Sequence, residues 1–174
     1  DYSVEYGGVP IDLDTADEWT ARGGASRLAI LVGWDTADYT NEDSGSTPAL
    51  PISINGLDVG GVITDNMDGT YTTVVDAGDA FGTLTVAIEG HPAADLDGDG
   101  TYSDRIAVKN VFESLAASGG REVTLARNDV IDITKCNGCH DSAGQGVSLH
   151  GNNRTGEMQV CVLCHNADAT DINR

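Results

Sequence analysis

Residues 28–34 read LAILVGW, an unbroken apolar run within a chain of 174 residues. A run of this length, rich in branched side chains and bounded by turn-forming residues, is typical of a buried strand. Further short apolar runs occur, separated by glycine, aspartate, asparagine and proline. They cover residues 61–64, 70–76, 82–89, 106–115 and 122–126. This pattern predicts a mainly β fold, with the strands in an antiparallel Ig-like or Greek-key sandwich.

The segments between these runs predict how the strands connect. The Asp-Gly pair within residues 66–69 (NMDG) supplies the positive φ angles of a tight hairpin, so the flanking runs are expected to pair. Residues 38–51 contain two prolines and many small polar residues, and they are expected to form a surface loop. Residues 12–22 are a weak candidate for a helix.

The charge of the chain is strongly acidic, with 28 Asp and Glu against 9 Lys and Arg and a net charge of -19. Residues 1–104 hold 20 of the acids and two arginines, whereas residues 105–174 are nearly neutral. Because binding to phosphates depends on clustered basic residues, we expect neither nucleic acid nor an anionic membrane surface as a partner. A membrane span is not expected either, since no apolar stretch approaches about 18 residues. The acid excess is expected to keep the chain soluble.

The neutral end of the chain contains two C-x-x-C-H motifs, CNGCH at residues 136–140 and CVLCH at residues 161–165. In such a motif the two thiols form thioethers with the vinyl groups of a haem, and the histidine binds the iron. The motifs account for every cysteine in the chain and predict two haem c groups. The predicted attachment residues are Cys136, Cys139, Cys161 and Cys164, and the predicted proximal iron ligands are His140 and His165.

Three other functions of paired cysteines compete with this interpretation. Two C-x-x-C pairs are also found in zinc ribbons, at a similar separation. Structural disulfides form in oxidising compartments, and thioredoxin-like redox pairs lie within βαβ units. None of these alternatives requires a histidine directly after both pairs. The sequence therefore favours haem attachment.

The remaining histidines are candidates for the distal iron ligands. The chain has four histidines, and two bis-histidine haems need four imidazoles. His150 lies between the motifs and is followed by glycine, whereas His91 follows the run at 82–89, where an exposed loop histidine is the alternative. The spacing does not indicate which haem each would serve. Met67 and Met158 are less well placed alternative donors. Because bis-histidine ligation leaves no open position on iron, an electron carrier is favoured over an enzyme.

The segment around the motifs has few large apolar side chains and many glycine, asparagine and aspartate residues. Such a segment cannot build a core alone, so we expect it to wrap its haems with short helices and loops. The chain is accordingly divided into a β-sandwich domain, residues 1–127, and a diheme segment, residues 128–174. Arg154 is predicted to pair with a haem propionate through its bidentate fork.

Residues 95–104 (DLDGDGTYSD) match the first half of a calcium-binding loop. Three aspartates alternate with other residues and are followed by glycine, but position twelve of the loop is Ile106 and not glutamate. An acidic turn between two strands is the alternative. The candidate calcium ligands are Asp95, Asp97, Asp99 and Asp104.

Residues 121–174 resemble the first two haem sites of the extracellular multihaem c-type cytochromes of the OmcA/MtrC decahaem family. The resemblance rests on the two motifs, on LHGNNRT (149–155) and on CHNADATDI (164–172), and it extends upstream through residues 88–110 and, more loosely, 28–41. It implies a β-sandwich beside the haems, His150 and His91 as distal ligands, and electron transfer at the cell surface or outside the cell. External acceptors or neighbouring cytochromes would be its partners.

That family carries around ten haems, whereas the present sequence contains two motifs and ends nine residues after the second. Two accounts are open. The chain is either part of a longer cytochrome or a diheme protomer that stacks with copies of itself into a filament, in which a neighbouring subunit supplies an axial histidine. A third account, from another class, makes the acidic part a surface-binding module with auxiliary haems.

Overall fold

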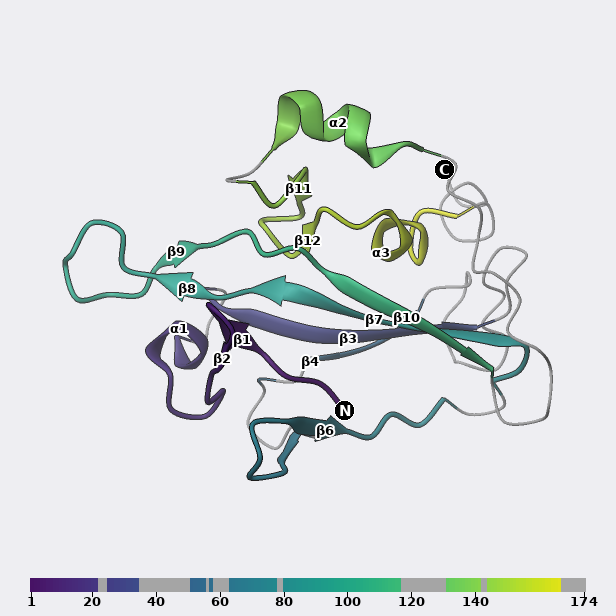
Figure 1. Cartoon of the computed structure of the whole chain (residues 1–174), viewed down its shortest axis with the longest axis horizontal. Helices are drawn as coiled ribbons and strands as arrows, with labels where there is room; N and C mark the ends of the chain where they lie inside the picture. Colours follow the sequence, from purple (N-terminus) through teal and green to yellow (C-terminus); the bar gives the residue numbers. More distant parts are fainter. Residues whose placement is uncertain are drawn as a thin grey trace.

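The computed structural model describes residues 1–21, 25–34, 51–55, 57, 63–77, 80–116, 131–141 and 144–166. Its centre is a four-stranded antiparallel sheet in the order β10-β7-β3-β4 (Figure 1). The strands of this central sheet are β3 (Arg27–Trp34), β4 (Ile52–Asn55), β7 (Thr83–His91) and β10 (Val111–Ala116). The described part of the chain is therefore mainly β, as predicted.

Short hairpins and helices surround the central sheet. The antiparallel pairs are β1 (Glu5–Tyr6) with β2 (Val9–Pro10), β5 (Ile63–Asp65) with β6 (Tyr71–Thr73), β8 (Ala93–Ala94) with β9 (Asp104–Arg105), and β11 (Ser148–Leu149) with β12 (Arg154–Thr155). The helices are α1 (Asp17–Thr20), α2 (Ile133–His140) and α3 (Met158–Val162).

Several sequence predictions are confirmed. The run at 28–34 lies in β3, the run at 82–89 lies in β7, and the hairpin around 66–69 forms between β5 and β6. Its positive φ angles fall at Met67 and Gly69, so the turn is not built on the Asp-Gly pair alone. The predicted helix is confirmed over one turn, α1. The finer prediction of an Ig-like or Greek-key sandwich stays a prediction.

The run at 106–115 is a strand only from Val111 onward. Asn110, the residue directly before this strand, instead forms hydrogen bonds with Thr155, which lies between the two C-x-x-C-H motifs. The Asn110 backbone N–H donates to the Thr155 carbonyl (2.9 Å), and the Thr155 N–H donates to Asn110 Oδ1 (2.7 Å). The predicted loop up to residue 50, the strand at 122–126 and the domain boundary at 127/128 lie outside the described residues.

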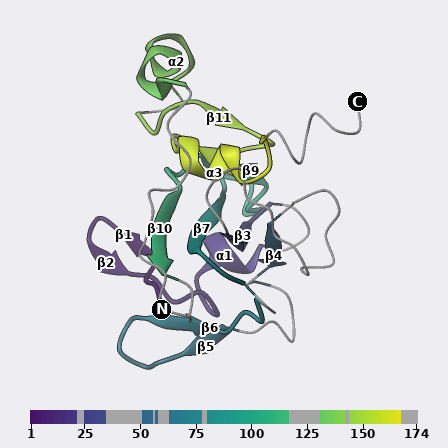
Figure 2. The same ribbon diagram turned by 90° about the vertical axis from the view of Figure 1, so that its right-hand side faces the viewer.

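The two faces of the central sheet pack against different parts of the chain. Because side chains alternate along a strand, Ile30, Val32 and Trp34 of β3 share one face, where they pack with Val75 and Ala77. Figures 1 and 2 show the β5–β6 hairpin beyond this face and the haem-motif segment above the other. The apolar run of β3 is therefore buried on both sides, as its composition predicted.

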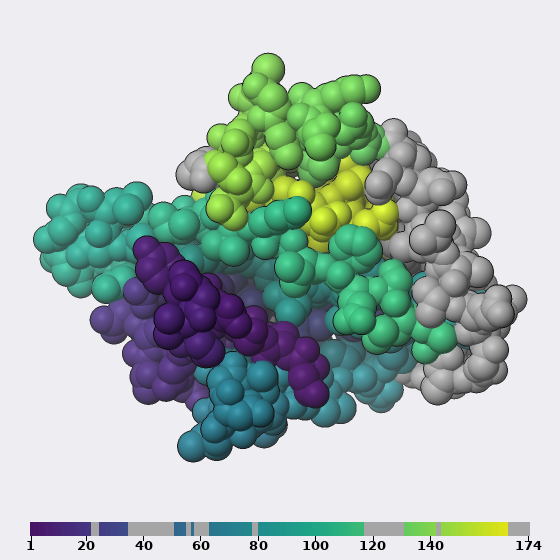
Figure 3. All heavy atoms as spheres, viewed as in Figure 1, coloured from purple at the N-terminus to yellow at the C-terminus, as the bar shows by residue number. Residues whose placement is uncertain are grey.

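Helix α3 shares a hydrophobic core with the opposite face of the sheet. Leu31 of β3 and Ala87 of β7 pack against buried residues of α3 and against Leu163, which follows the helix. The buried residues of α3 in this cluster are Met158, Val160 and Val162. In the space-filling view the yellow residues around α3 lie between the green residues around α2 and the teal strands (Figure 3). The second C-x-x-C-H motif is therefore anchored to the sheet by direct packing.

Replacing Leu163 with alanine tests this anchoring. The side chain is 0% exposed, so its truncation should lower the free energy of unfolding by about 2–5 kcal/mol. Chemical denaturation measures the loss. The control is Leu149→Ala, because Leu149 is 55% exposed and its loss should cost about 0.5 kcal/mol or less. Equal effects of the two variants would contradict the shared core.

Within the described residues, no helix has the length and apolar character that crossing a membrane requires.

Candidate functional site

The first motif lies on α2. Asp132 caps this helix, since its carboxylate accepts a hydrogen bond from the Thr134 N–H (3.1 Å). Cys136 and Cys139 are three positions apart, which places both thiols on the same side of the helix. No residue of α2 is buried, and Cys139 and His140 are exposed. The helix thus presents both thiols and the histidine on a surface that the described protein leaves uncovered.

The second motif begins in α3 and continues into the turn that follows. The N–H groups of Cys164 and His165 both donate to the Cys161 carbonyl (3.2 and 2.9 Å). These bonds keep Cys161 and Cys164 on the same side, although α3 itself ends at Val162. Burial raises the pKa of both thiols, and the positive charge of Arg154 acts in the opposite direction. All four cysteines are free.

His150 lies in the turn between β11 and β12, in an unusual backbone conformation. His150, Gly151 and Asn152 have φ angles of 54°, 67° and 69°, so three successive residues are left-handed. Such a conformation is uncommon outside glycine, although histidine and asparagine tolerate it better than most residues. Strained positions of this kind occur often at functional sites.

Hydrogen bonds hold this turn on the neighbouring strands. The Asn152 side chain donates to the Arg105 carbonyl (2.8 Å) and accepts from Ser148 Oγ (2.9 Å). The Gly90 N–H of β7 donates to the Asn153 carbonyl (2.9 Å). The turn is therefore fixed from both β7 and β9, and so is the position of His150.

The imidazoles of His150 and His165 lie close together. Their ring centres are 6.0 Å apart and the planes are inclined by 39°. Two imidazoles that bind one metal from opposite sides, each through a bond of about 2 Å, have ring centres about 6 Å apart. Burial, Arg154 and His165 together lower the pKa of His150, which favours the neutral, ligating form of the ring. The distance is compatible with axial ligation of one iron, and it also falls within the range of about 4.5–7 Å of ordinary contacts between aromatic rings.

His91 is placed differently. It ends β7 and is 1% exposed, so the alternative of an exposed loop histidine is wrong. Its Nδ1 lies 3.3 Å from the Pro92 carbonyl, and the Ala25 backbone provides a second hydrogen bond. Burial lowers the pKa of the ring. Its role as a distal ligand stays a prediction, and binding iron would require these bonds to be exchanged.

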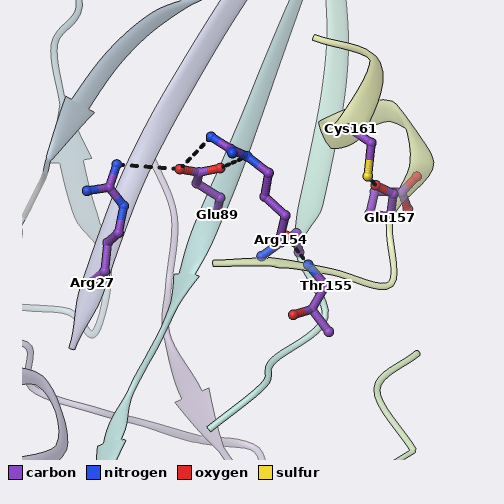
Figure 4. A network of polar contacts seen from close by, with 7 residues as sticks. Arg27, Glu89, Arg154, Thr155, Glu157 and Cys161 are labelled. Atoms are coloured by element: carbon purple, nitrogen blue, oxygen red, sulfur yellow. Dashed lines mark hydrogen bonds and ion pairs between the residues drawn. The ribbon is translucent and has the colours of Figure 1, made fainter. Parts of the chain in front are cut away.

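A buried ion pair beneath the second motif escaped the sequence analysis. Arg154 Nε lies 2.6 Å from Glu89 Oε2, and Arg27 Nη2 lies 3.5 Å from Glu89 Oε1 (Figure 4). The Glu89 side chain is 0% exposed. Arg154 pairs with Glu89 because a buried carboxylate requires a cation. Its pairing with a haem propionate stays a prediction. A glutamate within the apolar run at 82–89 was the signal for this pair.

Among the described residues, a group of three close potential metal ligands consists of Asp95, Asp97 and Asp99, whose carboxylate oxygens lie within 4.8 Å of one another. The cysteines do not form such a group, so the geometry of a zinc ribbon is not seen there. Desolvation alone would raise the pKa of Asp95, but the N–H groups of Gly100, Gly98 and Asp99 outweigh it and lower that pKa. Asp104 instead accepts from the Leu96 N–H (3.2 Å).

Calcium binding at this loop stays a prediction, and thermal unfolding checks it. Calcium at a hundredfold excess over its dissociation constant should add about 2.7 kcal/mol to the free energy of unfolding. In the double variant Asp97→Asn, Asp99→Asn the increase should disappear. A chain whose unfolding is the same in calcium and in chelator has an acidic turn at this loop and no site.

Comparisons of the chain with protein-family models, with curated proteins and with solved structures found no match. The case for function therefore rests on the residues themselves.

Proposed function

We propose that the chain is an extracellular or cell-surface electron carrier with two covalently attached haem c groups, each ligated by two histidines. The observation that carries this proposal is the meeting of His150 with His165 at a ring separation of 6.0 Å. His165 belongs to a C-x-x-C-H motif, and His150 was predicted as a distal ligand without regard to that contact. This separation is compatible with two axial ligands of a single iron.

Each residue of the second site has a distinct task in this proposal. Cys161 and Cys164 tether the haem, His165 and His150 bind its iron, and the left-handed turn holds His150 in place. When bound, the haem would supply a one-electron iron couple. Because both axial positions are taken, the site passes electrons without binding a substrate at the metal.

The first site is built for contact with other molecules. Its helix carries Cys136, Cys139 and His140 on an uncovered surface, farther from the central sheet than α3 (Figures 1 and 2). A haem held there would be accessible to another redox partner, and His91 is the second predicted distal ligand. We therefore propose that electrons enter or leave through the first site.

The resemblance to the OmcA/MtrC cytochromes supports the same proposal for location and partners. External acceptors, neighbouring multihaem cytochromes or copies of this chain would exchange electrons with it. A filament of copies, a longer cytochrome that includes this chain, and a surface-binding module with auxiliary haems remain the forms in which it would act. An Ig-like or Greek-key sandwich around the central sheet belongs to the same proposal.

A pyridine haemochrome assay on purified, haem-loaded protein tests the function. We expect two c-type haems per chain, each adding its mass covalently, and low-spin spectra in both oxidation states. Two double variants each remove one pair of cysteines: Cys136→Ala with Cys139→Ala, and Cys161→Ala with Cys164→Ala. Each double variant should retain one haem. Colourless protein, or zinc in place of iron, would overturn the proposal.

A further inference from the structure

The buried carboxylate of Glu89 lies on the face of the sheet that supports the haem motifs. Side chains alternate along β7, so Glu89 shares its face with Ala87, which packs against α3. Its side chain is fully buried, and its ion-pair partner Arg154 is 19% exposed. The Arg154 Nη2 also donates to Glu89 Oε1 (3.3 Å). The Glu89–Arg154 ion pair thus lies on the same face of the sheet as the second motif.

Stability alone does not explain this pair. Removing charges from water costs several kcal/mol per ion, and buried ion pairs can often be replaced by apolar residues without loss of stability. Ala87, the preceding residue on the same face of β7, is apolar, and an apolar residue could have stood at position 89 as well. The pair is therefore expected to have a role in the site above it.

The position of Arg154 couples the pair to the second motif. Arg154 lies on β12 opposite Leu149, the residue before His150. Cys161 packs against the cluster that contains Ala87, which lies two residues before Glu89 on the same face of β7. Both charges therefore lie beside the residues that would hold one haem. In a buried setting electrostatic interactions are strong and poorly screened by salt.

We propose that the buried Glu89–Arg154 pair sets the reduction potential of the haem bound at Cys161 and Cys164. Reduction removes one positive charge from the iron, so a nearby cation favours the reduced state and a nearby anion favours the oxidised state. Arg154 accordingly raises the potential, Glu89 lowers it, and Arg27 limits the effect of Glu89. The inference rests on the proposed function, because it requires a haem at the second motif.

Spectroelectrochemical titration of the haem-loaded full chain tests this role. We expect two midpoint potentials in the parent protein. Arg154→Gln should lower one of the two midpoint potentials by about 59 mV, which corresponds to about a tenfold decrease in the equilibrium constant for reduction. Glu89→Gln should raise the same one, because it leaves Arg154 without its counter-charge. The other potential should move much less.

Matched variants separate this effect from general charge changes and from loss of structure. Glu113→Gln removes the same charge from an exposed position on β10, and Arg105→Gln removes a cation from the exposed residue whose Nη1 donates to the Gly151 carbonyl (3.4 Å). Both should shift the potentials less than their buried counterparts. Arg154→Lys keeps the charge and should stay near the parent value even where Arg154→Gln does not.

The outcomes are distinguishable. Two haems per chain with shifts of opposite sign for Arg154→Gln and Glu89→Gln support the inference, since loosened packing alone would not reverse the sign. Two haems with unchanged potentials, or with shifts of the same sign, overturn it and leave the proposed function intact. Protein without haem at the second motif in the parent chain overturns the proposed function itself.

Discussion

If the chain carries the two proposed haems, replacing His150 with alanine is expected to convert one of them from low-spin, six-coordinate iron to high-spin, five-coordinate iron. The ring centre of His150 lies 6.0 Å from that of His165, and nothing in an alanine side chain can bind the metal. Both haems should remain attached, because the thioethers form at the cysteines. Visible and electron paramagnetic resonance spectra measure the change in spin state.

Two backgrounds that each retain one haem identify which haem is affected. The first background is the double variant Cys136→Ala with Cys139→Ala, which keeps only the second haem. Adding His150→Ala to it should make the whole spectrum high-spin. The second background is the double variant Cys161→Ala with Cys164→Ala, which keeps only the first haem. Adding His150→Ala to it should leave the spectrum unchanged. The comparison variant His91→Gln should show the reverse pattern if His91 serves the first haem. A low-spin second haem in the absence of His150 would contradict the axial pair.

Replacing Gly90 with alanine is expected to destabilise the sheet by about 3 kcal/mol. Gly90 has a φ of 145°, and an added Cβ would overlap the Arg27 carbonyl of β3. The backbone would have to move, which would also disturb the hydrogen bond from the Gly90 N–H to Asn153. Denaturation curves measure the loss of stability, and the spectrum of the second haem reports the disturbance of the turn.

The control for this variant is Gly98→Ala. Gly98 also has a positive φ, of 75°, but a Cβ there would meet no atom within 4 Å. Its replacement should cost about 1 kcal/mol, the penalty of the backbone conformation alone. If the two alanine variants were equally stable, close approach of β3 and β7 at Gly90 would not be the reason for its glycine.

The sequence predicted those parts of the molecule that depend on local patterns. Residue type and spacing were sufficient to predict the strand β3 and the β5–β6 hairpin. They were also sufficient to recognise the two C-x-x-C-H motifs. The strand predicted at 106–115 begins only at Val111, because Lys109 and Asn110 bond instead to Gln145 and Thr155, which are distant in sequence. Contacts of that kind leave no periodic signal.

The candidate site shows the same division. His150 could be selected from the sequence as an iron ligand, but its contact with His165 depends on a left-handed turn clamped by Asn152 and Gly90. The ion pair of Arg154 with Glu89 was not predicted, because the two residues are 65 positions apart in the sequence. Only the fold shows that a strand of the sheet supplies the counter-charge.

The packing of α3 onto β3 and β7 would give a haem at the second motif a further use. Since Leu31, Ala87 and Leu163 belong to one cluster, melting of the sheet must alter the surroundings of that chromophore. Its colour would then follow thermal denaturation as an intrinsic optical probe. Ile133 of α2 also packs against this cluster, but no residue of α2 is fully buried. The colour of a haem at the first motif would therefore report the same melting with a smaller change.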